Sequence, residues 1–131
     1  GLAEQLSGLF PQTRVEVLSG EEHLIEALLE AQGLVNATPV GMHVHPGMPL
    51  SESALRAGVL CEGLWVADVI YLPQETQLVR AARAAGCEVL TGGYMAVGQA
   101  VDAFRLFTGL EPNAERMAAH FEALIAAQQG V

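Results

Sequence analysis

Polar residues and glycines follow three apolar runs that have the length of β-strands. Asn36 and Thr38 follow the first run, Tyr71 ends the second, and Gly92 and Gly93 follow the third. In an open α/β sheet the carboxyl ends of parallel strands meet at one edge, and ligands bind there. Amide and hydroxyl groups can both donate and accept hydrogen bonds, and glycines at a helix start leave backbone N–H groups accessible. These residues therefore predict one ligand site at that edge.

The residues alone leave the role of each position open. Two adjacent glycines before a helix also suit a tight strand-to-helix turn without any ligand. The Tyr71 ring could pack against neighbours instead of a ligand. Gln99 lies a turn and a half into the helix after the glycines, so its amide could bind a hydroxylated ligand or face solvent.

Other common chemistries find little support in the side chains present. His43 and His45 alternate in a proline-rich loop, but no cysteine or carboxylate stands within a few residues, so we expect a solvated loop and no metal site. The chain lacks both glycine-rich phosphate-binding patterns, Gly-x-Gly-x-x-Gly and Gly-x-x-x-x-Gly-Lys. Ser51, Ser53 and Thr76 have no nearby set of histidine and carboxylate, which disfavours a hydrolase triad.

Length and composition predict one compact unit. The chain has 131 residues, of which 51% are hydrophobic and 16% charged, enough for one core. The formal net charge of −9 disfavours nucleic acid and anionic membrane surfaces as partners. No apolar run approaches the length of a membrane span. Cys61 and Cys87 stand in apolar surroundings and are expected to be reduced core thiols, as in a cytoplasmic protein.

The apolar periodicity predicts strands that alternate with helices around a mostly parallel sheet, which is the α/β class. Ser19 and Glu22 form a capping box at the start of the first such helix, and Gly33 is expected to end it as a left-handed cap. Ser51 and Asn113 are further expected helix caps. The expected strands are 13–18, 34–38, 64–71 and 87–90, and the helices after the first are 51–60, 75–85, 92–108 and the segment from 113.

Each long helix carries an apolar stripe that should face a neighbour. Asp68 interrupts the otherwise apolar strand 64–71, and because an unpaired buried charge is costly, we expect it to have a structural partner in preference to a ligand. The expected buried stripes are Leu24, Ile25, Leu28 and Leu29; Val97, Ala100, Val101, Phe104 and Phe107; and Met117, Phe121, Leu124 and Ile125.

Three segments, in order, resemble motifs of one family. Residues 36–42, Asn-Ala-Thr-Pro-Val-Gly-Met, resemble an Asn-Ala-Thr-x-x-Gly-Met signature. Residues 68–76, Asp-Val-Ile-Tyr-x-Pro-x-x-Thr, are similar to the strand and turn that follow it. Residues 95–109, Met-Ala-Val-x-Gln-Ala-x-x-Ala-Phe-x-x-Phe-x-Gly, are similar to the helix on the substrate side. The family is that of the shikimate dehydrogenases, and the similarity covers about residues 34–112.

The resemblance implies an oxidoreductase that reversibly oxidises a hydroxyl group of shikimate or quinate with NAD or NADP. Asn36 and Thr38 would line the ribose and nicotinamide side, Val69 would offer its carbonyl to the carboxamide, and Met95 would pack on the ring. Tyr71 and Gln99 would contact the substrate. The implied cofactor-binding positions are Asn36, Thr38, Val69, Gly92 and Met95.

Two local features refine the resemblance. Thr91-Gly92-Gly93-Tyr94-Met95 stands where the family usually has Asp-Gly-Leu-Gly-Met, so Tyr94 occupies the place of the second glycine of that pattern. The segments 45–47 and 101–112 are more similar to the quinate/shikimate branch, which often prefers NAD.

The resemblance also implies that this chain contains no catalytic residue, because the family's catalytic Lys and Asp, its substrate domain and its phosphate loop would precede residue 1. Residues 1–112 would form an incomplete Rossmann-like, doubly wound domain without its first strands, and 113–131 a C-terminal helix and tail. We expect the lone chain to be inactive, and to be unstable unless its own N-terminal portion or another copy completes the sheet. The alternatives are a non-catalytic module that binds a nucleotide or a partner, and an oligomer-forming scaffold.

Overall fold

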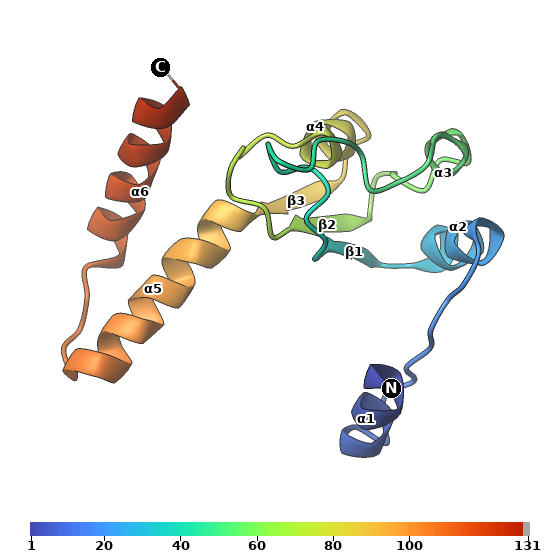
Figure 1. Ribbon diagram of the computed structural model, residues 1–131, viewed down its shortest axis with the longest axis horizontal. Helices are drawn as coiled ribbons and strands as arrows, with labels where there is room; N and C mark the ends of the chain where they lie inside the picture. The colour runs from blue at the N-terminus through green and yellow to red at the C-terminus, as the bar shows by residue number, and fades with distance from the viewer. Residues whose placement is uncertain (130–131) are drawn as a thin grey trace.

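The computed structural model describes residues 1–129, so the end of the expected C-terminal helix and tail, residues 130–131, lies outside the described residues. Three parallel strands form one sheet in the order β1-β2-β3 (Figure 1). They are β1 (Gly33–Asn36), β2 (Trp65–Asp68) and β3 (Glu88–Thr91). The register places Asn36, Asp68 and Thr91 in one row at the carboxyl ends. The expected class, α/β with a parallel sheet, is confirmed.

Six helices surround or extend from the sheet in the described part of the chain. The expected caps at Ser51 and Asn113 are confirmed, because their side chains accept the backbone N–H groups of Ala54 and Arg116. Two long helices form the expected C-terminal pair and contact each other. The helices are α1 (Leu2–Leu9), α2 (Glu21–Glu30), α3 (Glu52–Arg56), α4 (Gln77–Ala84), α5 (Gly92–Thr108) and α6 (Ala114–Gln129).

One face of the sheet carries the core. Side chains alternate between the two faces along a strand, so Leu34, Val66 and Val89 share a face across the three strands. They pack with α4 and α3, where Leu78 and Ala54 are almost fully buried. Full burial of a large aliphatic side chain such as Val66 or Leu78 stabilises the sheet by roughly 1.5–3 kcal/mol.

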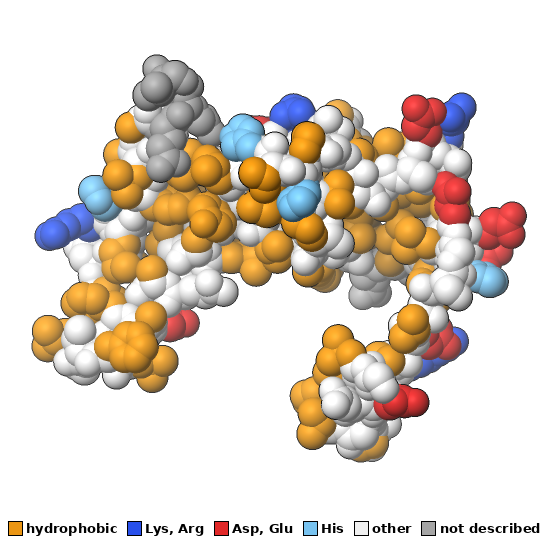
Figure 2. All heavy atoms as spheres, in the orientation of Figure 1, with side chains coloured by type: hydrophobic (Ala, Val, Ile, Leu, Met, Phe, Trp, Pro, Cys, Tyr) orange, Lys and Arg blue, Asp and Glu red, His pale blue; other side chains and the backbone are white. Residues whose placement is uncertain are grey.

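The opposite face of the sheet is open. Val35, Trp65 and Leu90 point to this side and are 51%, 46% and 48% exposed. Figure 2 shows how apolar side chains also gather at the outer end of α5 and on α1, which lies apart from the sheet. Among the described residues no element therefore covers this face at Trp65 of β2. No helix of the described residues is long and apolar enough to cross a membrane.

The expected strand 13–18 is not formed. These residues run extended without a ladder partner among the described residues, and a strand exists only where a neighbour supplies hydrogen bonds. The capping box at Ser19 is also wrong: α2 begins at Glu21 after Gly20, whose φ of +92° suits glycine, and no side chain caps it. Gly33 is not a helix cap but the first residue of β1, where the Trp65 indole lies over it.

The expected apolar stripes are buried only in part. Leu28, Val101 and Ile125 are buried on α2, α5 and α6, whereas Leu29 is 55% and Phe107 88% exposed. These side chains lack a neighbouring element in the described residues, so an amphipathic pattern predicts a helix correctly without fixing what covers it. The remaining exposed stripe residues are Leu24, Ala100, Phe104 and Leu124.

Only one of the two cysteines is a core thiol. Cys87 is buried and donates to the Cys61 carbonyl oxygen at 3.3 Å, and its burial raises the pKa of the Cys87 thiol. Cys61 is exposed, in the turn before β2, so the expectation of a core position is wrong for it.

The contact between Gly33 and Trp65 gives a test of the sheet. A Cβ atom at residue 33 would lie 1.9 Å from Trp65 Cε2, so Gly33→Ala must displace the indole. We expect Gly33→Ala to lower the free energy of unfolding by about 1–3 kcal/mol in urea titration. Gly98→Ala is the matched control, since nothing lies within 4 Å of its Cβ position. Equal stability of the two variants would contradict the close packing at Gly33.

Candidate functional site: the carboxyl edge of the sheet

A buried carboxylate organises the carboxyl edge of the sheet. Asp68, at the end of β2, has no exposed surface. Its Oδ1 accepts from Asn36 Nδ2 at 3.1 Å and from the Ile70 backbone N–H at 3.1 Å, and its Oδ2 accepts from Thr76 Oγ1 at 2.7 Å. Thr76 also caps α4 through the Val79 N–H. The expectation of structural pairing for Asp68 is confirmed, and the pairing joins β1, β2 and α4.

Asn36 extends this network into the loop after β1. Its Nδ2 donates to Asp68 and to the Val40 carbonyl oxygen at 3.1 Å. Its Oδ1 accepts from the Thr38 N–H at 3.2 Å and from the Thr38 hydroxyl at 2.7 Å. Two donors and two acceptor sites are all that a primary amide offers. The buried Asn36 side chain therefore holds the loop in shape and has no hydrogen-bonding capacity to spare.

Thr38 continues the same chain of contacts but is exposed. Its Oγ1 donates to Asn36 and accepts from the Val40 N–H at 3.2 Å. This leaves its second lone pair and its methyl group toward solvent at the edge. A direct contact with a ligand is therefore open to Thr38, whereas Asn36 would act by fixing the position of Thr38 and of the backbone at Ala37.

Gly92 brings the start of α5 against the end of β2. A Cβ atom at Gly92 would lie 2.4 Å from the Val69 carbonyl oxygen and 2.6 Å from the Ile70 carbonyl carbon. Backbone on both sides cannot move away cheaply, so this helix start requires glycine. The structure thus brings two of the expected cofactor positions, Val69 and Gly92, into direct contact. The tight strand-to-helix turn, which was the alternative interpretation of the two adjacent glycines, is present at Gly92.

Met95 and Gln99 lie on one face of α5. They follow Gly92 by three and seven residues, and such spacing places side chains on the same side of a helix. Met95 is half-buried, one turn from the edge, and Gln99 is exposed. At a rise of about 1.5 Å per residue, Gln99 stands roughly 10 Å along the helix from Gly92. This face is a continuous surface that begins at the sheet edge.

Tyr71 turns toward α6. Its ring centroid is 6.4 Å from that of Phe121 with an angle of 59° between the planes, and it is 52% exposed. A Cβ atom at Gly93 would be 3.0 Å from the Phe121 ring, so the same aromatic side chain also covers the helix start. The gathering of Thr38, Tyr71 and Gln99 around one ligand stays a prediction, with each on a different segment.

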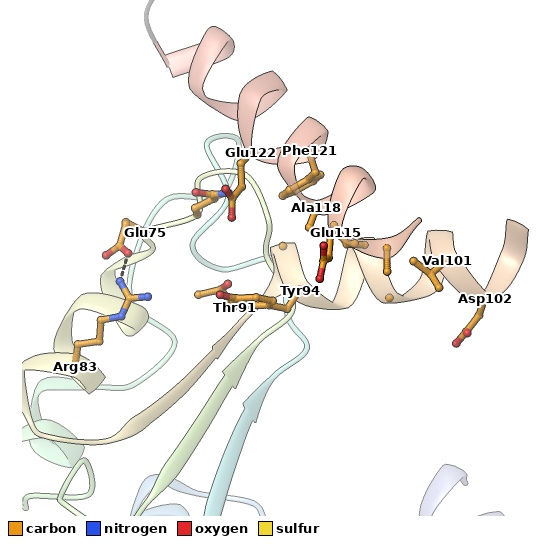
Figure 3. A pocket seen from close by; sticks show the side chains of 15 residues that line it. Glu75, Arg83, Thr91, Tyr94, Val101, Asp102, Glu115, Ala118, Phe121 and Glu122 are labelled. Carbon is orange, nitrogen blue, oxygen red and sulfur yellow. Dashed lines mark hydrogen bonds and ion pairs between the residues drawn. The ribbon is translucent and has the colours of Figure 1, made fainter. Parts of the chain in front are cut away.

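A groove on another face of α5 was not predicted from the sequence. It encloses about 610 Å³ between α5, α6 and the segment before α4 (Figure 3). Tyr94, Val97 and Val101 line it from α5, and Ala118 and Phe121 from α6. The sequence signal was the Val97–Val101 stripe, but a groove appears only once α6 packs back on α5. Its acidic wall makes it unsuited to phosphate groups.

The chemistry of the sheet edge fits one end of a dinucleotide. Segments 36–40, 69–76 and 91–95 supply amide, hydroxyl, backbone and apolar groups, and contain no arginine, lysine or histidine. Such groups suit a flat nicotinamide ring and its carboxamide. The phosphates would need a glycine-rich loop or cations, which these segments do not provide. His43 and His45, in the turn closed by the Met42–His45 bridge, are both exposed.

Substitution at Gly92 tests the contact between α5 and β2. Gly92→Ala forces a methyl group onto two carbonyl groups, and we expect a loss of about 2–4 kcal/mol in the free energy of unfolding. Gly98→Ala in the same helix should instead gain about 0.5–1 kcal/mol, since alanine favours helix. Chemical denaturation followed by circular dichroism measures both. A neutral Gly92→Ala would show that the two backbones are not in contact.

Substitution at Asp68 tests the polar network. Asp68→Asn offers one oxygen and an amino group to three donors, so at least one buried donor loses its acceptor. We expect Asp68→Asn to lower the free energy of unfolding by about 1–3 kcal/mol. Asp102→Asn, at an exposed ion pair with Arg105, should change the stability by less than about 0.5 kcal/mol. Equal effects in urea titration would exclude an organising role for Asp68.

Comparison with known proteins finds relatives over nearly the whole chain. A family model described as "Shikimate 5'-dehydrogenase C-terminal domain" matches residues 94–120. Shikimate dehydrogenase (NADP(+)) of Arthrobacter sp. (strain FB24) is 54% identical over 127 residues, which cover 97% of this chain and 41% of that protein. Quinate/shikimate dehydrogenase (NAD(+)) of Corynebacterium efficiens is 56% identical over 99 residues, covering 76% of this chain and 33% of that protein.

The fold agrees with a solved relative. The structure of quinate dehydrogenase from Corynebacterium glutamicum in complex with NAD matches with a TM-score of 0.78 and 44% identity. The match covers 93% of this chain and 41% of that one, so the chain spans less than half the length of these relatives. With its Rossmann-like α/β architecture, the chain corresponds over nearly its whole length to a C-terminal part of shikimate and quinate dehydrogenases.

Proposed function

We propose that this chain supplies the nicotinamide side and part of the substrate contacts of an NAD(P)-dependent dehydrogenase that oxidises shikimate, quinate or both. The observation that carries the proposal is the close approach of Gly92 to Val69. It joins the Met95–Gln99 face of α5 to the edge that Thr38 and Asn36 shape. The names of the relatives, which include shikimate and quinate dehydrogenases using NADP or NAD, support the same assignment.

Each residue then has a distinct task. Met95 packs on the nicotinamide ring, the Val69 carbonyl accepts from the carboxamide, and Thr38 contacts the cofactor from the loop that Asn36 holds. Gln99 and Tyr71 hold hydroxyl groups of the substrate. The bound NAD(P) supplies the acceptor for the hydride that leaves the substrate carbon.

The proton that leaves with the hydride needs a general base, which these residues do not provide. The six basic residues of the chain are all arginines, so the family's catalytic Lys is not among its 131 residues. Proton transfer requires a group with a suitable pKa at the reacting oxygen. We propose that this group comes from further polypeptide, which also covers the open face at Val35, Trp65 and Leu90 and pairs with the outer edge of β1. An N-terminal portion of the same protein could both supply the base and cover the face, whereas a second copy of this chain could only cover the face and pair with β1.

A non-catalytic binding module is the second candidate. The absence of lysine and the open apolar sheet face favour it, since both are compatible with a module that binds a nucleotide or a partner without chemistry. For either function we place the protein in a reducing compartment such as the cytoplasm, in keeping with the free thiols of Cys61 and Cys87.

Mass spectrometry of the native polypeptide and an assay of NAD(P)H absorbance distinguish the dehydrogenase from the non-catalytic binding module. We expect the 131-residue chain alone to form no NAD(P)H from quinate or shikimate, and a longer native polypeptide to form it. In that polypeptide Gln99→Ala should lower kcat/KM by about 10–100-fold, because substrate hydrogen bonds are lost. Gln77→Ala, exposed at the start of α4, is the control. A native mass equal to that of this chain, with no activity, would favour the binding module.

A further inference from the structure

The groove between α5 and α6 has the dimensions of a ligand site. It starts at the sheet edge, where Thr91 and Gly93 line it, and continues along α5. Its volume of about 610 Å³ lies within the range of small-molecule sites. Tyr94, Val97 and Val101 are spaced by three and four residues along α5, on a different face from Met95 and Gln99. A ligand in the groove would therefore not occupy the place proposed for the nicotinamide ring.

The walls of the groove carry a strong excess of negative charge. Four carboxylates line it, those of Glu75, Asp102, Glu115 and Glu122, against the single guanidinium of Arg83. That guanidinium pairs with Glu75, and Asp102 pairs with Arg105 at 3.0 Å. Within the described residues, no cation pairs with Glu115 or Glu122. Glu115 lies in the first turn of α6, where the helix dipole stabilises a negative charge. Glu122 lies two turns further along, where the dipole no longer stabilises it.

The floor of the groove is apolar and aromatic. Val97, Val101 and Ala118 form an apolar surface beside the Phe121 ring, and Tyr94 stands at the wall with 72% of its surface exposed. Figure 3 shows the carboxylates of Glu115 and Glu122 extending from α6 toward the side where Tyr94 lies. An aromatic face next to carboxylates attracts a cation through the ring quadrupole and through charge. Tyr94 stands where the family pattern has glycine, so at this position a phenol ring is added to the wall of the groove.

We propose that the groove binds a small organic cation, a primary ammonium group attached to an aromatic or alkyl body. The body packs on Val97, Val101 and Phe121, and the ammonium group lies between Tyr94 and the carboxylates of Glu115 and Glu122. The negative wall repels phosphates and carboxylates, which excludes the dinucleotide and an acidic substrate from this groove. The site thus differs from the Met95–Gln99 face of α5 in both position and charge.

Three probes of similar shape but different charge test whether the groove prefers a cation. The protein, labelled with ¹⁵N and in its native assembly, is titrated with 2-phenylethylammonium, 2-phenylethanol and phenylacetate, and amide shifts are followed by NMR. We expect the cation to shift resonances of Tyr94, Gly98 and Ala118 with a Kd of about 1 mM or tighter. The alcohol should bind about tenfold more weakly, and the anion should cause no shifts there. Equal affinity of the cation and the alcohol would overturn the proposal, as would shifts confined to other parts of the protein.

Two independent variants test the location. Glu115→Gln/Glu122→Gln should weaken the ammonium probe about tenfold and leave the alcohol unchanged, whereas Glu62→Gln/Glu88→Gln, outside the groove, removes the same charge without effect. Gly98→Leu fills the groove from α5, where nothing lies within 4 Å of the Cβ position, and should abolish binding without lowering the melting temperature. Unchanged affinity in either groove variant, with the fold verified by circular dichroism, would overturn the assignment.

Discussion

The carboxylate of Asp68 is the interaction on which the rest of the sheet edge depends. It is fully buried and faces neutral donors from three segments: the amide of Asn36, the N–H of Ile70 and the hydroxyl of Thr76. Hydrogen bonds to a charged acceptor are stronger than those between neutral groups and are costly to lose inside a protein. One side chain thereby fixes where β1 ends, how the chain leaves β2 and where α4 begins.

The second constraint is steric. Without a side chain at Gly92, α5 can begin directly against the carbonyl groups of Val69 and Ile70. The polar network sets the loops on one side of the edge, and this contact sets the helix on the other. Together they fix the end of β1, the chain after β2 and the start of α5 relative to one another.

Local sequence signals predicted much of this arrangement. The bounds of α5 are those predicted from its periodicity, and the caps at Ser51 and Asn113 depend only on residues a few positions away. Asp68 was recognisable because a charge in an apolar strand needs partners. Features that depend on distant neighbours were not predictable in this way. The alternation at 13–18 is typical of a strand, but without an adjacent strand those residues form no ladder. Phe107 likewise belongs to an apolar helix stripe but is exposed, because no neighbouring element among the described residues covers it. The groove needs α6 folded back on α5, which no local pattern specifies.

The open sheet face has one more consequence. Trp65 is the single tryptophan of the chain, and its half-exposed indole lies over the backbone of Gly33 at the amino ends of β1 and β2 on that face. Indole emission shifts with the polarity around the ring, so this side chain is a built-in optical reporter. Its fluorescence would move toward shorter wavelengths when polypeptide or another molecule excludes water from β1 and β2, without any label being added.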